Sequence, residues 1–149
     1  MTIRSAQAGD ADAVHQLVDA AYRHYVARLG KPPGPMLDDY ALRVANGQVW
    51  VLEDGGALTG VLVLEDAEGG ALLLDNIAVA PTAQGKGYGR ALMAFAEAEA
   101  RRRRHAQIRL YTHVLMTENL ALYGRLGFRE TSRITEKGYE RVYMAKQLT

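Results

Sequence analysis

The chain of 149 residues contains no cysteine. Disulfide bonds, thiolate metal sites and catalysis through an acyl-cysteine are therefore excluded together. An excess of charge of one sign is also missing, because 18 Lys and Arg residues face 17 Asp and Glu residues and leave a formal net charge of +1. This balance gives no support to a general polyanion binder, and we expect no nucleic-acid partner.

Long apolar runs are absent as well. No stretch of about 18 apolar residues occurs, so the sequence predicts no membrane span and no membrane partner. The first 20 residues carry Arg4, Asp10, Asp12, His15 and Asp19, which is unlike a signal peptide. These features favour a soluble protein of the cytoplasm. The four histidines show no ligand spacing, so we expect no metal.

Strand and helix patterns alternate along the whole chain, which predicts one domain over residues 1–149. We expect strands at Met1–Arg4, Gln48–Glu53, Ala57–Glu65, Ala71–Val79, Gln107–Thr112, Arg129–Thr135 and Tyr139–Lys146, and helices at Ala11–Leu29, Leu37–Val44, Tyr88–Arg103 and Glu118–Leu126. Asp10 is predicted to cap the first helix. This order predicts an α/β fold, a mixed sheet with helices on both faces.

A glycine-rich turn before the longest helix carries the clearest ligand signal. It reads Gln84-Gly85-Lys86-Gly87-Tyr88-Gly89-Arg90. Glycines let a backbone approach a ligand closely, and the first amides of a helix carry the positive end of its dipole. A phosphate or pyrophosphate fits there, and Lys86 and Arg90 add positive charge.

Three kinds of phosphate site can be compared with this turn, and two of them do not fit its sequence. A P-loop needs Ser or Thr after Gly-Lys, but Gly87 follows Lys86. A dinucleotide site needs G-x-G-x-x-G and an acid about 20 residues later, but the spacing here is G-x-G-x-G and Gln107–Thr112 contains no acid. The third kind is a site for the pyrophosphate arm of coenzyme A, and a connector without a ligand is the alternative.

The segment Gln84-x-x-Gly87-x-Gly89 resembles the coenzyme A signature Q/R-x-x-G-x-G/A of the GNAT superfamily of N-acyltransferases. Two other segments are similar to motifs of that family. Asp75–Pro81 resembles its "NIAV-P" strand, notably in the ribosomal-protein-alanine acetyltransferase branch, and Leu122–Phe128 resembles its "LY-x-x-LGF" helix. The order of the expected strands and helices also agrees with the family from residue 3 to residue 148.

The resemblance implies the GNAT fold, a twisted and mostly antiparallel sheet with one splayed parallel pair, Ala71–Val79 and Gln107–Thr112. It also implies acetyl-CoA as cosubstrate, with the pantetheine arm lying between these strands and bonding to backbone groups of Ile77 and Val79. The cofactor-binding residues implied in this way are Ile77, Ala78, Val79, Gln84, Gly85, Lys86, Gly87, Tyr88, Gly89, Arg90, Asn119 and Tyr123.

The implied reaction is direct transfer of acetyl to a primary amine, with Tyr123 as the general acid that protonates the leaving sulfur. Packing under the strands is the alternative role of Tyr123. Some relatives carry a glutamate base twelve residues earlier, and here that position is Tyr111. Asp75 is the best remaining base, with a solvated carboxylate as its alternative, and Glu118 is a third option. Asn119 is expected either to contact the pantetheine or to cap its helix.

The sequence does not name the acceptor, which is either a small-molecule amine or a protein amine. In the family the first two helices and the last hairpin build the acceptor site. Here those segments contain Tyr22, His24, Tyr25, Tyr40, Tyr139 and Tyr143. The tyrosines among them would form an aromatic cleft for a flat or cationic amine, with ordinary packing as the alternative. A monomer and a homodimer both remain open. A non-catalytic acyl-CoA sensor is the second functional hypothesis, against which Tyr123 argues.

Overall fold

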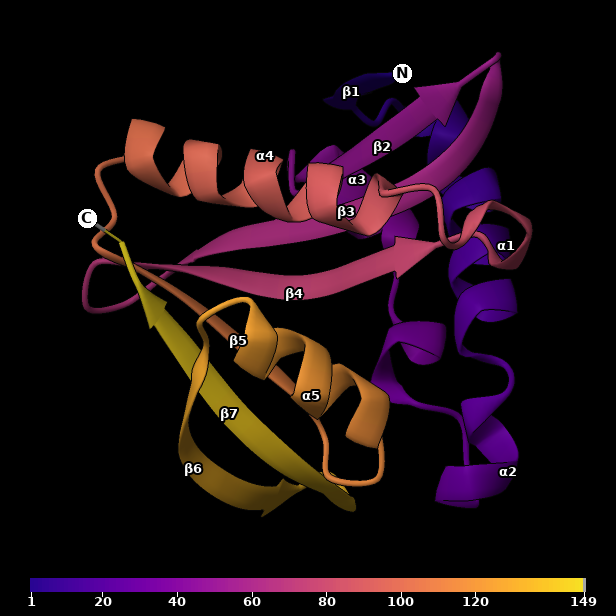
Figure 1. Cartoon of the computed structure of the whole chain (residues 1–149). Coiled ribbons are helices and arrows are strands. Elements are labelled where there is room, and N and C mark those ends of the chain that lie inside the picture. The colour runs from indigo at the N-terminus through magenta and orange to yellow at the C-terminus, as the bar shows by residue number, and fades with distance from the viewer. Residues whose placement is uncertain (149) are drawn as a thin grey trace. The chain divides into compact units, whose positions relative to one another are not determined.

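The computed structural model describes residues 1–148 (Figure 1). Seven strands follow the order β1-β2-β3-β4-β5-β7-β6. They are β1 Thr2–Ser5, β2 Val49–Asp54, β3 Ala57–Ala67, β4 Ala71–Val79, β5 Gln107–His113, β6 Arg129–Glu136 and β7 Tyr139–Gln147. The β4–β5 pair is parallel, whereas β1–β2, β2–β3, β5–β7 and β6–β7 are antiparallel. The expected mixed, mostly antiparallel sheet is confirmed.

Five α-helices and three 3₁₀ turns complete the described part of the chain. The helices are α1 Ala11–Tyr22, α2 Tyr25–Leu29, α3 Tyr40–Ala45, α4 Tyr88–Arg102 and α5 Thr117–Arg125, and the turns are η1 Ala8–Asp10, η2 Gly34–Leu37 and η3 Pro81–Ala83. The chain forms two compact units, each described by itself below. The first comprises Met1–Leu64 and Asn76–Ala96, and the second comprises Glu65–Asp75 and the chain from Glu97 onward.

In the first unit, helices cover both faces of the strands (Figure 1). Val14, Leu17 and Val18 of α1 follow helical spacing and are buried against the valines of β2 and β3. On the other face α4 packs closely on β3. A Cβ atom added at Gly60 would lie 2.8 Å from Leu92 Cδ1, so a side chain there would have to displace the end of the Leu92 side chain.

Two predicted helices have different bounds from those expected. The single helix Ala11–Leu29 is wrong, because α1 and α2 are separated at Arg23 and His24, where the Val26 N–H bonds three residues back to the Arg23 carbonyl. The helix expected from Leu37 begins at Tyr40 instead. Asp39 caps it by accepting a hydrogen bond of 3.1 Å from the Leu42 N–H, and the preceding segment forms the turn η2.

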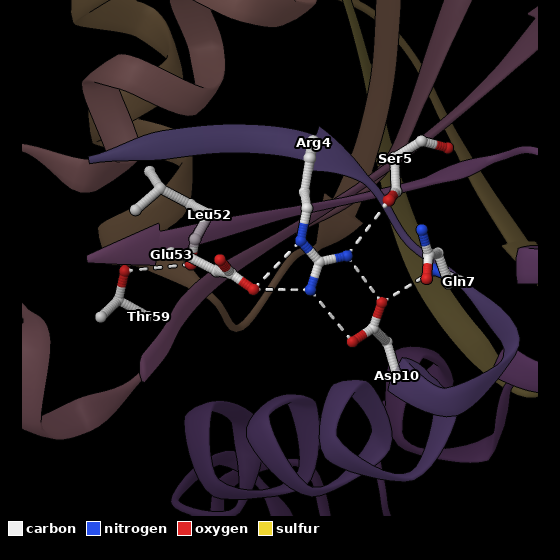
Figure 2. Close-up of polar contacts among 7 residues, drawn as sticks. All are labelled: Arg4, Ser5, Gln7, Asp10, Leu52, Glu53 and Thr59. Carbon is white, nitrogen blue, oxygen red and sulfur yellow. Dashed lines mark hydrogen bonds and ion pairs between the residues drawn. The ribbon is translucent and has the colours of Figure 1, made fainter. Parts of the chain in front are cut away.

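The prediction that Asp10 caps the first helix is also wrong. Asp10 stands at the N-cap position, but its side chain accepts no hydrogen bond from α1. It accepts instead from the Gln7 N–H at 2.8 Å and from both terminal nitrogens of Arg4 at 2.7 and 3.1 Å. Arg4 also donates to Glu53 at 2.6 and 3.0 Å (Figure 2). The Asp10 carboxylate therefore pairs with the charged Arg4 guanidinium instead of accepting a hydrogen bond from a backbone amide of α1.

In the second unit, the two faces of strand β5 differ in burial. Ile108, Leu110 and Thr112 of β5 are buried, and the alternate residues, among them Tyr111, are half-buried. The β6–β7 hairpin turns at Lys137 and Gly138, both with positive φ (53° and 77°), as a two-residue type I′ turn requires. Within residues 1–148, no helix is long and apolar enough to cross a membrane.

Candidate functional site

The glycine-rich turn of the first unit leads directly into α4. Gly85 and Gly87 have φ of +82° and +83°, and an added Cβ atom would meet nothing within 4 Å at either position. Glycine is therefore needed here for its backbone conformation, and the space around both residues is open. Gln84, Lys86 and Arg90 are exposed. The turn presents two cations at the positive end of a 15-residue helix, which is an arrangement that suits a phosphate.

The side chain of Tyr88 fixes the start of this helix. It is buried, and its hydroxyl donates a short hydrogen bond to Asp54 Oδ2 at the end of β2. This bond is the main reason that the pKa of the Asp54 carboxyl is lowered, while the same bond raises the pKa of Tyr88. Tyr88 therefore anchors α4 through its side chain, and only its backbone is left for a ligand.

The end of β4 holds the three residues expected along the pantetheine. Ala78 is buried, whereas Ile77 and Val79 are half-buried. The Tyr22 hydroxyl lies 2.8 Å from Asn76 Oδ1 and 3.3 Å from the Ile77 carbonyl, so it joins α1 to this strand.

Asn76 extends this network toward the proline-rich loop. Its amide donates to the Tyr40 hydroxyl at 3.1 Å, and that hydroxyl donates to the Pro35 carbonyl at 2.5 Å. The Tyr25 ring is buried, with its centroid 4.0 Å from that of His24. The contacts described for Tyr22 and Tyr25 are thus structural, and their predicted contact with an acceptor stays a prediction.

The second unit brings Asp75 and Tyr111 together. The parallel ladder pairs Leu74 with Leu110, so the next residue on each strand is Asp75 and Tyr111. The Tyr111 hydroxyl donates to Asp75 Oδ1 at 3.3 Å. Burial, and then the charge of Asp75, raise the pKa of Tyr111 far above its usual range. The hydroxyl thus keeps its proton at any working pH and acts as a donor to the carboxylate.

Arg141 and Glu136, which the sequence did not assign to the site, lie on the same face as Tyr111, together with Tyr143 of the expected aromatic cleft. Arg141 Cζ is 4.4 Å from the centroid of the Tyr111 ring, and Arg141 Nη1 donates to Glu136 Oε1 at 2.9 Å. Tyr143 lies directly opposite Tyr111 in the ladder, and the two rings meet edge-on with their centroids 5.4 Å apart. The Tyr143 hydroxyl donates a short hydrogen bond to Glu136. The hydrogen bond from Tyr143, and to a smaller extent the one from Arg141, lowers the pKa of Glu136, so its carboxyl group is charged.

The alternation of residues along β7 could have indicated part of this cluster from the sequence. Residues 139, 141 and 143 alternate along β7, so their side chains share one face. The structure adds that Arg141 also lies 5.6 Å from the centroid of the Tyr139 ring. Tyr139, expected to contact a cationic amine, thus already contacts a cation from its own strand.

The predicted acid Tyr123 belongs to a separate group of contacts. Its ring is 7% exposed and packs edge-on against Phe128, with the centroids 5.9 Å apart. Asn119 does not cap α5, because Met116 is the N-cap residue, and the Asn119 amide instead lies 3.7 Å from Met116 Sδ. Met116 also contacts Thr112, whose side chain points away from the face that carries Tyr111.

These positions divide the predicted residues into separate sets. Asp75 lies with Tyr111 on one face of β5, whereas the start of α5, the helix that carries Tyr123, contacts the other face. Glu118 is exposed in the first turn of α5 and accepts a hydrogen bond from Thr117 at 3.0 Å. Within residues 1–148, no group of three or more His, Cys, Asp or Glu side chains is placed to hold a metal ion.

Comparison with known proteins was made by sequence and by structure. A sequence model of the family described as "Acetyltransferase (GNAT) domain" matches residues 45–130. The solved IAA acetyltransferase of Bacillus cereus ATCC 14579 is 25% identical, with 99% of each chain covered and a TM-score of 0.73. The Salmonella typhimurium protein yncA, solved with its cofactor acetyl-CoA, is 25% identical over 100% of this chain and 94% of that one, with a TM-score of 0.75.

A third structure supports the fold alone. The ribosomal-protein-alanine N-acetyltransferase of Brucella melitensis is 24% identical, with 99% of this chain and 100% of that chain covered and a TM-score of 0.75. Among curated proteins, no sequence matches this chain significantly.

Proposed function

The chain belongs to the GNAT acetyltransferase domain family, whose sequence model matches more than half of it, and from this premise we propose that it transfers acetyl from acetyl-CoA to a primary amine. The observation that carries the proposal is the glycine-rich start of α4 inside the matched segment. There Gly85 and Gly87 hold a positive φ in open space beside exposed Lys86. The acetyl-CoA in the Salmonella protein supports the same cosubstrate.

In this proposal the first unit binds the cofactor. Backbone N–H groups from Gly85 to Gly89 donate to the pyrophosphate, and Lys86 and Arg90 compensate its charge. Backbone groups of Ile77 and Val79 bond to the pantetheine amides, with Ala78 packed between them. Gln84 and Asn119 complete the proposed contacts.

The second unit supplies the chemistry. The nitrogen of the neutral amine attacks the thioester carbonyl carbon, a C–N bond forms and the C–S bond breaks. Asp75 accepts the proton that the nitrogen loses, directly or through a water, and Tyr123 donates a proton to the departing sulfur. The base serves the nitrogen and the acid serves the sulfur, so the two groups do not need to touch each other.

A base that deprotonates the amine accelerates the reaction most when the acceptor amine has a high pKa. A lysine-like amine of pKa about 10.4 is neutral in roughly one molecule in two thousand at pH 7, whereas an α-amine of pKa about 8 is neutral in roughly one in ten. Tyr111 stands where some relatives carry glutamate, and it keeps its proton, so it cannot take that role. Of the two remaining candidates, Glu118 is exposed in the first turn of α5, and Asp75 is the proposed base.

We also propose that residues 1–149 act as one functional domain. Strand β4 contributes Asp75 to the chemistry and Ile77–Val79 to the cofactor, so one strand carries residues of both compact units.

A panel of amines tests the proposal. The protein is incubated with acetyl-CoA and each amine, and release of free thiol is followed. We expect turnover with a subset of the amines and acetylation at nitrogen by mass spectrometry. Tight binding of acetyl-CoA without turnover of any amine would instead support the non-catalytic sensor, and absence of acetyl-CoA binding would contradict both.

A further inference from the structure

Arg141 has no part in the transfer as described, yet it lies next to the proposed base. Tyr111 connects the two groups, because its hydroxyl bonds to Asp75 and its ring face lies 4.4 Å from Arg141 Cζ. A carboxylate at the hydroxyl and a guanidinium over the ring thus both contact one tyrosine side chain. Two opposite charges beside the same tyrosine are complementary to a small molecule that carries both an ammonium and a carboxylate.

The guanidinium is held in place before any ligand arrives. Its side chain is only 15% exposed, it lies against the rings of Tyr111 and Tyr139, and Glu136 fixes it through Nη1. Burial disfavours its charge, but the contacts with Glu136 and the nearby tyrosines outweigh this and raise its pKa. A preorganised arginine loses little side-chain freedom on binding, which favours affinity.

The ion pair with Glu136 leaves other N–H donors of the Arg141 guanidinium for a second partner. Arginine presents five N–H donors in a planar fork; Nη1 pairs with Glu136, and the Tyr143 side chain also bonds to the guanidinium. The remaining donors suit a second carboxylate, which arginine recognises with two parallel hydrogen bonds. Asp75, the proposed base, lies at the hydroxyl of Tyr111 and suits the ammonium group.

We propose that the acceptor is an amino acid, with its ammonium placed at Asp75 and its carboxylate bound by Arg141. This assignment rests on the proposed acetyl transfer and narrows it from any amine to a zwitterionic one. It also revises the expected aromatic cleft, since Arg141 lies over the ring of Tyr139, one of the tyrosines expected to contact a cationic amine.

Matched pairs of acceptors test the assignment. Each of the standard L-amino acids is compared with its carboxamide, which keeps the amine and the side chain but loses the negative charge. We expect kcat/KM of the best amino acid to exceed that of its carboxamide by roughly 10- to 100-fold, the range of a charged hydrogen-bonded pair. Arg141→Met should lower kcat/KM for the amino acid much more than that for its carboxamide and so remove this preference.

Two further variants serve as controls. Arg133→Met removes an exposed arginine that pairs with Glu130 at 3.0 Å on β6, and the preference should persist. Arg141→Lys keeps the charge but not the fork, so it should retain a reduced preference even where Arg141→Met folds poorly. Equal turnover of acids and carboxamides by the wild type, or an equal loss of both in the Arg141 variants, would overturn the assignment.

A binding measurement separates this assignment from the proposed transfer. The same amino acids and carboxamides are titrated into the protein, with binding followed by NMR. If no amine is turned over but amino acids still bind more tightly than their carboxamides, and Arg141→Met abolishes the difference, the transfer fails and the Arg141 site stands. If binding shows no dependence on the carboxylate, the site fails whatever the turnover.

Discussion

Tyr111 and Asp75 are neighbours on parallel strands, and the tyrosine hydroxyl donates to the carboxylate over 3.3 Å. The tyrosine occupies the position where some relatives of the family carry a glutamate base. Because burial and the charge of Asp75 raise its pKa, Tyr111 keeps its proton and can only hold the base, not replace it. In the proposed mechanism, Tyr111 is therefore a positioning residue for the proposed base Asp75.

Tyr111→Phe tests this positioning. The ring stays, so its contacts with Arg141 and Tyr143 are kept while the bond to Asp75 is lost. We expect kcat to fall by roughly 3- to 10-fold, consistent with the loss of one hydrogen bond to a charged group, while the acetyl-CoA affinity is unchanged. A purely structural role predicts instead a lower melting temperature with kcat per folded molecule unchanged.

Asp75→Asn removes the proposed base. The rate should fall most at low pH, where the acceptor amine is largely protonated and its proton must be taken up. At high pH the amine is neutral and the variant should approach the wild type. A pH–rate profile parallel to that of the wild type across the range would remove Asp75 from the mechanism.

Tyr123→Phe deletes only the hydroxyl and keeps the ring that packs on Phe128. General acid catalysis supplies about 10²- to 10⁴-fold, and a thiolate leaves tolerably well without help, so we expect kcat to fall by at least about 10-fold. Acetyl-CoA affinity should change little, which marks an interaction made mainly in the transition state. Full kcat with a rate-limiting chemical step, checked by single-turnover kinetics, would return Tyr123 to a packing role.

The network around Arg4 makes a separate prediction about stability and pH. The hydrogen bonds from Arg4, and then the one from the Gln7 N–H, lower the pKa of Asp10 in the folded protein. Its contribution to stability is therefore fully present above the ordinary Asp pKa of about 3.9 and is lost as the pH falls through the lower folded value. Urea unfolding should show wild type more stable than Arg4→Met at pH 7, with the difference shrinking below about pH 4.

A control for this experiment is available on β6. Arg133 is also paired with a glutamate, but both side chains are largely exposed, at 59% and 45%. Exposed pairs contribute little, so Arg133→Met should leave the unfolding free energy nearly unchanged at both pH values. A pH-independent effect of Arg4→Met would show that the loss comes from packing and not from Asp10.

Most of the fold could be read from the sequence because its signals are local. Asp54-Gly55-Gly56, Lys137-Gly138 and Pro81 mark strand ends, and the predicted β4, Ala71–Val79, has the observed bounds. The family match and the similar solved structures confirm the GNAT resemblance and the fold that it implied. The errors at Asp10 and at the start of α3 arose where a second polar group competed, namely Arg4 for the Asp10 carboxylate and Asp39 for the cap.

The site was less accessible to sequence reasoning. The glycine-rich turn is contiguous, so its pattern is visible, whereas the cluster around Asp75 joins residues of four strands, β4, β5, β6 and β7. Nothing local to Glu136 or Arg141 indicates that they meet Tyr111, since this depends on the register of β5, β7 and β6. The roles of Tyr123, Asn119 and the cofactor-binding residues stay predictions.

The proposed pyrophosphate site is tested by Gly87→Glu, with Gly47→Glu as a matched control. Both glycines have positive φ, +83° and +70°, and a Cβ atom at either would meet nothing within 4 Å. The backbone strain of the two substitutions is therefore similar, of the order of 1–3 kcal/mol. Only Gly87 precedes α4, where a carboxylate would repel the pyrophosphate. Calorimetry should show acetyl-CoA affinity reduced by at least about 100-fold in Gly87→Glu, a loss of about 2.7 kcal/mol or more, and unchanged in Gly47→Glu. Equal affinity in the two variants would remove the turn from the cofactor site, because strain alone would then account for every difference from the wild type.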